Sequence, residues 1–456
     1  MAGINKVLVA NRGEIACRVF RSARALGLST VAVYSEADAA SLHVDAADEA
    51  VAIGPSSPRE SYLNASNILE AARRVGADAI HPGYGFLAEN AAFAELVTAE
   101  GLNWIGPTAD IIRQMGDKQR AREIAQASGV PVVPGSRTFD MGDTDDLEVA
   151  GRAVGFPLLV KAVGGGGGIG MRRVDEESQL ASTVTATQSM AEKSFGNGAI
   201  FLERFVPRAR HIEIQVFGFG NGEAIHLFER DCSVQRRFQK VIEESPAPGL
   251  PEAVCRRMGE AAVSLCAHTR YGGAGTVEFI VDATSFDFFF LEMNTRIQVE
   301  HPVTEMVTGV DLVAMQIDFA RGRLTGAEQE GIRSAGHAIE CRLYAENPVK
   351  MFMPAPGPLT IFKPPAETEH VRVDSGYREG DVMTPFYDPL IAKLIVHGRD
   401  RLEACERAEQ ALRNWSIDGL RTNRDFLIGC LRNDAFRAGD VHTGFLDEHA
   451  KAILAA

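Results

Sequence analysis

Apolar residues recur with two different periods near the start of the chain, and they predict alternating strands and helices. Runs typical of buried strands lie at Lys6–Ala10, Thr30–Tyr34 and Ala77–His81. Segments with the three-to-four-residue spacing of helices lie at Gly13–Leu26 and Ile68–Val75. Such alternation favours a parallel sheet. Because ligands gather at the carboxyl ends of parallel strands, we expect a site near Asn11–Glu14 and His81–Phe86.

The rest of the chain is predicted to be richer in strands. In its middle part, strands are expected at Pro157–Ala162, Ala199–Phe205, His211–Phe217, Ala224–Glu229 and Gly275–Asp282, and helices after Gly116–Lys118 and at Glu252–His268. Further on, strands are expected at His337–Leu343, Val371–Ser375 and Leu390–His397, and a helix at Leu402–Asn414. This mixture predicts an α/β and α+β multidomain protein, and a length of 456 residues is typical of about three domains.

The segment Leu291–Thr304 carries a polar residue at every second position from Glu292 onward. These residues are Glu292, Asn294, Arg296, Gln298 and Glu300. If the segment is extended, all five side chains point to one side, because strand side chains alternate between faces. Two carboxylates, an amide and a guanidinium on one face suit a site for metal ions and a small anion. The alternative is a solvated edge strand, which the apolar run Phe286–Leu291 disfavours.

Two other groups of residues indicate phosphate or metal binding. Five glycines, Gly164–Gly168, follow the strand that carries Lys161, and backbone N–H groups of glycines approach anions closely. A flexible hinge is the alternative, but the run favours a mobile loop over a triphosphate. Glu278 and Glu292 are expected on two strands of a hairpin and, with Asn294, offer oxygen ligands to magnesium, or else form a cross-strand surface pair.

The stretch Gln235–Lys240 is locally basic in an acidic protein, which indicates either anion binding or a solvated charge run. The formal net charge of −14 disfavours a nucleic-acid binder. The seven cysteines show no zinc spacing and are typical of free thiols in a reducing compartment. No signal peptide is seen, and no run approaches the ~18 apolar residues of a membrane helix. These features predict a cytoplasmic protein without membrane or nucleic-acid partners.

Taken together, these residues closely resemble the biotin carboxylase family, a branch of the ATP-grasp enzymes, from roughly Lys6 to Leu446. The resemblance rests on the motifs ANRGEIA (Ala10–Ala16), HPGYGFLAEN (His81–Asn90), MGDK (Met115–Lys118), KAVGGGGGIGM (Lys161–Met171), RHIEIQVFG (Arg210–Gly218), ERDCSVQRRFQKVIEESPAP (Glu229–Pro248), GAGTVEF (Gly273–Phe279), EMNTRIQVEHPVTE (Glu292–Glu305) and YDPLIAKL (Tyr387–Leu394). It implies a Rossmann-like N-domain (1–114), an ATP-grasp central domain (115–330) with a mobile lid (about 133–205), and a C-terminal biotin carboxylase domain (331–447).

The resemblance also implies a reaction and its residues. ATP activates bicarbonate as carboxyphosphate, which then carboxylates biotin carried on another protein. The implied ATP-binding residues are Lys118, Lys161, Gly165, Gly166, Gly167, Gly168, Glu203, Val206, His211 and Gln235. Two magnesium or manganese ions are assigned to Glu278, Glu292 and Asn294, and bicarbonate to Lys240, Arg296, Gln298 and Val299.

The implied catalytic residues are Glu300, Arg296, Arg342 and Lys240, with Glu300 as general base. Biotin is assigned to Tyr84, Gly85 and Arg342, and Arg342 is expected to stabilise the biotin enolate. Arg18 and Asp388 resemble residues of the biotin side or of a dimer interface.

Two positions depart from the family pattern. Phe238 replaces the histidine of QRRHQK, and Ile169 replaces the arginine of GGGGRGM, so a donor and a charge near the phosphates are missing. Because the metal and base positions are all present, we expect an active enzyme. A binding or regulatory module that has lost catalysis is the rival interpretation that these two residues support.

No Ala-Met-Lys-Met biotinylation motif is seen, and Val349–Met351 is only a superficial echo of one. The resemblance therefore implies a separate subunit, expected as a homodimer, that works with a biotin carboxyl carrier protein and carboxyltransferase subunits. An acetyl-CoA or other acyl-CoA carboxylase is the expected setting. A pyruvate- or urea-type carboxylase remains open. Another ATP-grasp ligase is disfavoured by HPGYGF, YDPLIAKL and Arg342.

Overall fold

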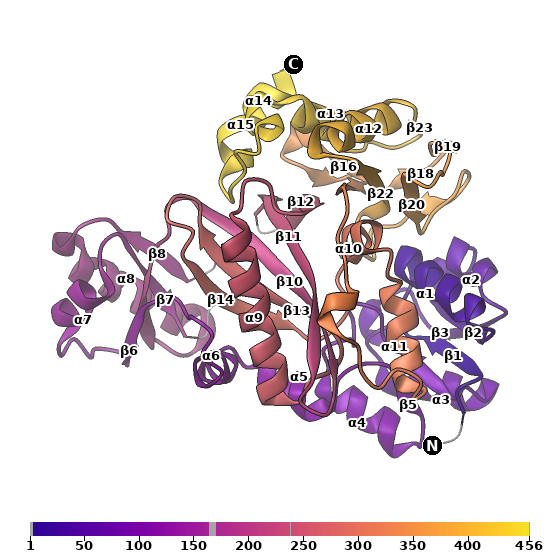
Figure 1. The fold of residues 1–456 in the computed structure, drawn as a ribbon, viewed down its shortest axis with the longest axis horizontal. Helices are drawn as coiled ribbons and strands as arrows, with labels where there is room; N and C mark the ends of the chain where they lie inside the picture. Colours follow the sequence, from indigo (N-terminus) through magenta and orange to yellow (C-terminus); the bar gives the residue numbers. More distant parts are fainter. Residues whose placement is uncertain (1–2, 164–169, 238, 456) are drawn as a thin grey trace. The chain divides into compact units, whose positions relative to one another are not determined.

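The computed structural model describes residues 3–163, 170–237 and 239–455. The chain divides into two compact units, one comprising Met1–Val130, Arg210–Phe279 and Glu292–Ala456, the other Pro131–Ala209 and Ile280–Leu291 (Figure 1). The predictions made for Gly165–Gly168, Ile169 and Phe238 lie outside the described residues.

A parallel five-stranded sheet forms the first part of the larger unit, as the alternating pattern predicted. Its strands, in spatial order, are β3 (Glu49–Gly54), β2 (Ser29–Ser35), β1 (Lys6–Val9), β4 (Ala79–His81) and β5 (Asn103–Trp104). The helices of this part are α1 (Gly13–Ala25), α2 (Leu42–Ala46), α3 (Ala65–Val75), α4 (Ala91–Ala99), α5 (Ala109–Gly116) and α6 (Lys118–Ala127). The apolar runs of the central strands fill the core on both faces of the sheet.

The segments that follow β1 and β4 meet at the carboxyl edge of this sheet. The Asn11 side-chain amide donates to the carbonyl of Pro82 at 2.8 Å and to that of Tyr84 at 2.7 Å. Between these two residues, Gly83 has a positive φ, and a Cβ there would lie 2.9 Å from the Asn11 amide nitrogen. A side chain at this position would therefore separate the two segments.

Most of the remaining strands of the larger unit belong to an eight-stranded sheet, in which Ile280–Leu291 of the β13–β14 hairpin are part of the smaller unit. Its spatial order is β14 (Phe288–Asn294), β13 (Gly272–Asp282), β10 (Ala209–Phe219), β11 (Ala224–Arg236), β12 (Gln239–Ser245), β15 (His337–Tyr344), β22 (Leu390–Gly398) and β20 (Val371–Ser375). Its helices are α9 (Glu252–Thr269), α10 (His301–Thr308), α11 (Leu312–Ala320), α12 (Arg401–Arg413), α13 (Arg424–Arg432), α14 (Asp434–Arg437) and α15 (Phe445–Ala455). The sheet runs without a break from strands expected in the central region to strands expected in the C-terminal region.

Buried apolar residues of β12, β15 and β22 pack with α12, α13 and α15 into one core that contains Trp415. Three two-stranded pairs complete this part of the chain. They are β16 (Glu346–Asn347) with β17 (Met353–Pro354), β18 (Gly357–Pro358) with β21 (Val382–Met383), and β19 (Ile361–Lys363) with β23 (Ser416–Asp418).

The smaller unit is built on an antiparallel four-stranded sheet. Its strands, in spatial order, are β6 (Gly135–Phe139), β9 (Ile200–Arg204), β7 (Leu158–Ala162) and β8 (Met171–Val174). The helices α7 (Leu147–Val154) and α8 (Leu180–Phe195) contribute to its apolar core. The predicted strands at Pro157–Ala162 and Ala199–Phe205 are thus confirmed to within one residue at each end.

The polar alternation of Leu291–Thr304 is a strand only at its start. The strand β14 ends at Asn294, and α10 begins at His301 with a proline in its first turn. Proline is favoured at that position because its fixed φ suits a helix start and its missing N–H has no helical partner there. A single extended strand through Arg296, Gln298 and Glu300 is therefore wrong, and the convergence of these side chains has another cause.

Gly376, just after β20, fixes the approach of this segment to the turn that begins α1. A Cβ at Gly376 would lie 2.6 Å from the backbone nitrogen of Glu14 and 2.8 Å from the Cα of Gly13. We expect Gly376→Ala to destabilise the protein by about 1–3 kcal/mol, the usual cost of overpacking. Chemical unfolding would measure the loss, with Gly331→Ala as the matched control because nothing lies within 4 Å of a Cβ there. Equal stability of the two variants would contradict this close approach.

Candidate functional site

A largely buried ammonium group, on a side chain that is 12% exposed, lies among three carboxylates at the centre of the site. Lys240 on β12 places its Nζ 2.5 Å from Glu300 Oε1, 2.7 Å from Glu213 Oε2 and 3.2 Å from Glu278 Oε1. Burial alone would lower the pKa of Lys240, but Cys232 and the three carboxylates raise it well above its usual value. The ammonium therefore stays charged. Its ion pairs link strands β10, β12 and β13 and the start of α10.

Glu300 sits directly before α10 and is held by cations on both sides. Its Oε1 faces Lys240, and its Oε2 accepts a hydrogen bond of 2.9 Å from the Arg342 guanidinium. Burial would raise the pKa of Glu300, but Lys240, Arg342 and Arg230 together lower it well below its usual value. Glu300 is thus ionised and able to accept a proton, and an anion that binds beside it would raise its basicity.

Glu213 and Arg230, which the sequence reasoning missed, form a buried ion pair that holds Lys240 in place. Arg230 is fully buried and donates from Nε to Glu213 Oε1 at 2.5 Å, while the other Glu213 oxygen accepts from Lys240. Arg230 also donates to Gln215 at 2.7 Å and to Thr304 at 2.9 Å. The available signal was the alternation of polar and β-branched residues along β10.

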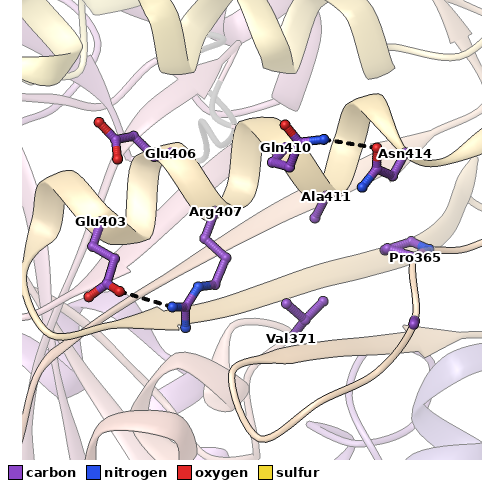
Figure 2. A pocket seen from close by; sticks show the side chains of 9 residues that line it. Pro365, Val371, Glu403, Glu406, Arg407, Gln410, Ala411 and Asn414 are labelled. Carbon is purple, nitrogen blue, oxygen red and sulfur yellow. Dashed lines mark hydrogen bonds and ion pairs between the residues drawn. The ribbon is translucent and has the colours of Figure 1, made fainter.

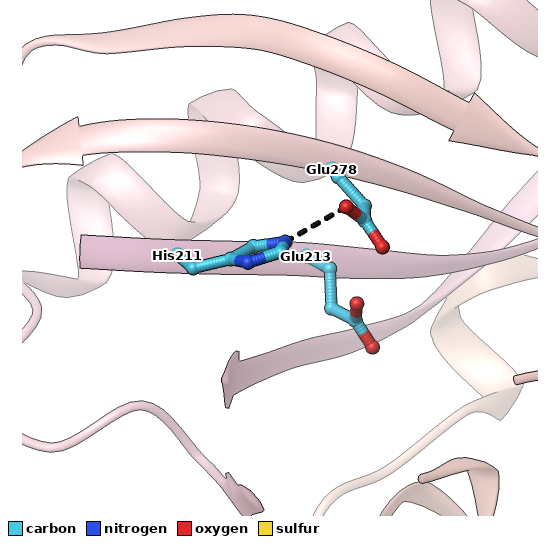
Figure 3. A group of neighbouring side chains, drawn as sticks. All are labelled: His211, Glu213 and Glu278. Carbon is cyan, nitrogen blue, oxygen red and sulfur yellow. Dashed lines mark hydrogen bonds and ion pairs between the residues drawn. The ribbon is translucent and has the colours of Figure 1, made fainter. Parts of the chain in front are cut away.

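Glu278 on β13 gathers donors from four directions. Its Oε2 accepts from His211 Nε2 at 2.8 Å, and its Oε1 accepts from Asn294 at 2.8 Å, Gln298 at 3.0 Å and Lys240. Figure 3 shows His211 and Glu278 pointing toward each other, with Glu213 beside them. The ligand atoms of these three residues lie within 4.8 Å of one another. His211, which was expected among the ATP-binding residues, is therefore in direct contact with a residue expected to hold metal ions.

Glu292 and Asn294 on β14 lie on the strand next to Glu278, which confirms the predicted hairpin. Burial raises the pKa of Glu292, and the negative charge of Glu278 raises it further. Two carboxylates that oppose each other's ionisation are stabilised by a cation between them. With the amide oxygen of Asn294 they form a hard oxygen donor set, which suits magnesium or manganese.

Arg296 and Gln298, two of the residues predicted to hold an anion with Val299, bond to each other although their segment is not a strand. Arg296 donates to Gln298 Oε1 at 2.7 Å, to Asn294 Oδ1 at 3.1 Å and to Glu89 at 2.9 Å. The Val299 carbonyl accepts from Lys393 at 2.8 Å. The bonds among Asn294, Arg296 and Gln298 fix the turn between β14 and α10. Their side chains therefore meet, as expected, although the segment is not extended.

The residues expected to bind nucleotide are divided between the two units. In the larger unit, Lys118 is the first residue of α6, and Gln235 pairs across the β11–β12 hairpin with Lys240. In the smaller unit, Lys161 on β7 forms an ion pair of 2.6 Å with Glu203 on β9, and Val206 follows that strand. The structure thus pairs Lys161 with Glu203, and the roles of these residues stay predictions.

A cavity of about 480 Å³ opens beside Glu300 and contains the residues expected to bind biotin. Its lining includes Tyr84, Gly85, Val299, Arg342 and Asp388. The Tyr84 hydroxyl donates to the Glu14 carboxylate, which also lines the cavity. The expected site at the ends of β1 and β4 therefore coincides with this cavity. Arg18 is instead buried in ion pairs with Glu305 and Asp311, at 2.6 and 2.8 Å.

A second hollow, of about 440 Å³, lies along α12 (Figure 2). Its walls carry the ion pair of Glu403 with Arg407 at 3.0 Å and the hydrogen bond of Gln410 to Asn414 at 2.9 Å. None of the residues predicted for the site lines this hollow within the described part of the chain.

Two further buried carboxyl groups lie behind Arg342. Glu243 on β12 and Glu340 on β15 are direct cross-strand partners, and Glu243 forms an ion pair with Arg342. Within the residues that the structure describes, the Glu340 carboxyl group has no hydrogen-bond partner. Burial raises the pKa of Glu243 to about 7, against the opposing effect of Arg342, and raises that of Glu340 well above its usual value. The pair therefore retains a proton at neutral pH.

This retained proton predicts a pH-dependent stability. Because the folded-state pKa of Glu243 is raised to about 7, the folded protein binds more protons than the unfolded chain, and stability falls as pH rises from 5 to 8. Glu243→Gln removes this titration, so wild type should lose about 1–3 kcal/mol relative to the variant over that range. Urea unfolding at pH 5, 6, 7 and 8 would measure the difference. Glu330→Gln, an exposed change, is the control, and parallel curves for wild type and Glu243→Gln would refute the prediction.

All seven cysteines are free thiols, as the sequence predicted. Over the described residues, the helices include none that combines the length and the apolar character needed to cross a membrane.

Three family models match successive parts of the chain. They are described as "Biotin carboxylase, N-terminal domain" (residues 3–112), "Carbamoyl-phosphate synthase L chain, ATP binding domain" (residues 117–325) and "Biotin carboxylase C-terminal domain" (residues 340–448).

Curated relatives match over nearly the whole chain. Biotin carboxylase 1 of Bacillus subtilis is 48% identical over 98% of this chain and 99% of its own length. A pyruvate carboxylase subunit of Methanothermobacter thermautotrophicus is 49% identical over 98% of this chain and 91% of its own length. The alpha subunit of mitochondrial methylcrotonoyl-CoA carboxylase from Rattus norvegicus is 50% identical over 99% of this chain, and the chain spans 63% of that relative.

Solved structures agree in fold. The biotin carboxylase domain dimer of Hydrogenobacter thermophilus 2-oxoglutarate carboxylase, in complex with magnesium ADP, ADP and bicarbonate, superposes with a TM-score of 0.89 at 43% identity, covering 99% of both chains. Biotin carboxylase of Campylobacter jejuni gives a TM-score of 0.90 at 41% identity, covering 98% of this chain and 99% of its own.

Proposed function

The chain belongs to the biotin carboxylase family of ATP-grasp ligases, and we propose that it uses ATP and bicarbonate to carboxylate biotin held on a carrier protein. One observation carries this proposal: Glu300 is held between Lys240 and Arg342, and Arg342 and Val299 line the adjacent cavity. A base, two cations and a cavity for the acceptor thus share one corner of the larger unit.

The first step requires that bicarbonate lose a proton as it attacks the terminal phosphate of ATP. In our proposal, Arg296, Gln298, Lys240 and the Val299 backbone orient the anion, and Glu300 takes the proton. The entering anion weakens the hold of Lys240 and Arg342 on Glu300, which raises its pKa at the moment a base is needed. Magnesium or manganese ions held by Glu278, Glu292 and Asn294 would offset the phosphate charge.

The second step transfers the carboxyl group to a ureido nitrogen of biotin. That nitrogen is a very weak acid, so its anion needs a cation close to the developing charge. Arg342 lines the cavity and presents a fixed guanidinium there, oriented by Glu300 and Glu243. We assign Tyr84 and Gly85 to the walls that position the biotin rings.

The nucleotide residues implied by the family resemblance are part of this proposal. We assign Lys118, His211 and Gln235 of the larger unit, and Lys161, Glu203 and Val206 of the smaller unit, to ATP. Lysine ammonium groups offset phosphate charge, and the Gly165–Gly168 run, outside the described residues, is assigned to the phosphates by its sequence.

The acceptor that finally receives the carboxyl group is proposed from the relatives. We infer a component of an acyl-CoA carboxylase, acting as a homodimer with a carrier protein and carboxyltransferase subunits, because a relative that is 50% identical is the alpha subunit of a methylcrotonoyl-CoA carboxylase. A pyruvate carboxylase is the second candidate, supported by the similarity to the pyruvate carboxylase subunit of Methanothermobacter thermautotrophicus. A cytoplasmic location stays a prediction.

The role of Glu300 as base is tested by Glu300→Gln, which keeps its size and removes its charge. We expect bicarbonate-dependent ATP hydrolysis in the presence of free biotin to fall by roughly 10²–10⁴-fold, the usual contribution of a general base. Steady-state assays of released phosphate would measure this, with the exposed change Glu406→Gln as control. Turnover equal to wild type would exclude Glu300 as the base.

The role of Arg342 predicts a different pattern for Arg342→Ala. Biotin carboxylation should fall far more than biotin-independent ATP hydrolysis, because Lys240 and Arg230 still hold Glu300. Since Arg342 lowers the pKa of Glu300, its loss should also shift the acid limb of the ATPase pH profile to higher pH. Measuring both activities from pH 5 to 9 checks this. Equal loss of the two activities would contradict the enolate role.

A further inference from the structure

Three large apolar side chains stand exposed on one short hairpin of the larger unit. Val349 and Met351 belong to the loop between β16 and β17, and Met353 begins β17; the three are 82%, 73% and 59% exposed. Single exposed apolar residues are ordinary, but three within five residues form a patch of the kind that marks an interaction site. The exposed Lys350 lies in the middle of this patch.

The backbone of this loop is held firmly in place. The Asn347 side-chain oxygen accepts from the Lys350 N–H at 3.3 Å, and the Asn347 backbone carbonyl accepts from the Phe352 N–H at 2.9 Å. The Phe352 ring packs edge-on against Phe426 at 4.9 Å, and the Arg236 guanidinium lies 4.4 Å from its centroid. Phe352 thus anchors the loop to the core, while its neighbours on either side point away from it.

The loop keeps this shape in spite of two backbone positions that disfavour it. Met351 and Phe352 have φ values of 51° and 58°, which side chains larger than glycine rarely adopt. Exposed apolar groups and positive φ both reduce stability, so stability does not explain the arrangement. A surface that is kept although it reduces the stability of the fold is typical of a binding site.

The base of the hairpin is bonded to the walls of the biotin cavity. The Ala345 N–H donates to the Pro389 carbonyl at 2.8 Å, and the Ala345 carbonyl accepts from Ala355 at 2.8 Å. Tyr344 and Asp388, the neighbours of these residues in sequence, line the cavity. On the other side, Arg236 links Glu346 to Gln239, another lining residue.

We propose that the hairpin patch of Val349, Lys350, Met351 and Met353 is the docking surface for the protein that carries biotin. This inference rests on the proposed function. A biotin on a flexible lysine arm reaches the cavity only if its protein sits beside the cavity mouth, and the patch is joined to the mouth by the bonds above. At the cavity itself, Phe386 is a lining residue that is 48% exposed and offers further apolar surface. Lys350 suits a partner with a carboxylate beside an apolar surface.

The test compares two forms of the same substrate. In the triple variant Val349→Ser, Met351→Asn, Met353→Ser, asparagine is chosen because it tolerates positive φ. Carboxylation of free biotin should be unchanged. The KM for the carrier protein of the same carboxylase, biotinylated in vitro, should rise at least about tenfold with kcat retained, the scale of a lost interface anchor. The matched control is Leu96→Ser, Leu402→Ser, Leu454→Ser, which removes three exposed leucines from helices of the same unit.

The possible results separate the docking surface from the activity on which it rests. A wild type that carboxylates no free biotin would overturn the proposed function itself. A triple variant with normal free-biotin turnover and an unchanged KM for the carrier would overturn the docking surface alone. An equal rise of KM for free biotin would make the hairpin part of the cavity wall and overturn it as well. A loss of dimer in the variant without a change in carrier KM would assign the patch to a second copy of this chain.

Discussion

The rest of the site depends on the ion pairs of the largely buried ammonium group of Lys240. A charge removed from water is tolerated only where partners of opposite charge replace the lost hydration, and Lys240 has three carboxylates within 3.2 Å. Each carboxylate then has a second partner of its own. Arg230 pairs with Glu213, His211 with Glu278, and Arg342 with Glu300. These successive ion pairs fix five strands, β10, β11, β12, β13 and β15, and the start of α10 relative to one another.

This charge network explains why the site is poised for anions and metal ions together. Glu292 and Glu340 stand at its two edges, and burial raises the pKa of both. At the Glu292 edge, oxygen donors converge and a divalent cation would favour ionisation. At the Glu340 edge, the surroundings are closed and a proton is retained instead. The negative charge of the network is thus offset in two ways. A bound cation would offset it at Glu292, and a retained proton offsets it at Glu340.

Periodicity predicted most of the fold, because the apolar runs of β1, β2, β4, β15 and β22 are long enough to be recognised without context. It failed between Asn294 and His301, where a turn followed by a proline-started helix imitates the alternation of a strand. It also missed Glu213, Arg230, Glu243 and Glu340, because both faces of their strands are buried and polar residues there look like exceptions to a core pattern. Only the pairing of distant strands shows that these exceptions neutralise one another. The roles of Lys240 and Arg342 came from the family resemblance, since neither spacing nor composition distinguishes them from surface charges.

The site and the hairpin patch answer different requirements. In the proposed function, the groups around Glu300 would act on bicarbonate and on the ureido ring of biotin, which are the same whatever molecule finally receives the carboxyl group. Discrimination between one carboxylase system and another therefore cannot arise at these groups. It has to arise where the chain meets the protein that brings biotin, and there the binding energy comes from surface side chains that can change without disturbing the charge network. A rigid loop anchored by Phe352, with exposed apolar neighbours free to vary, separates recognition of the partner from the chemistry of the site.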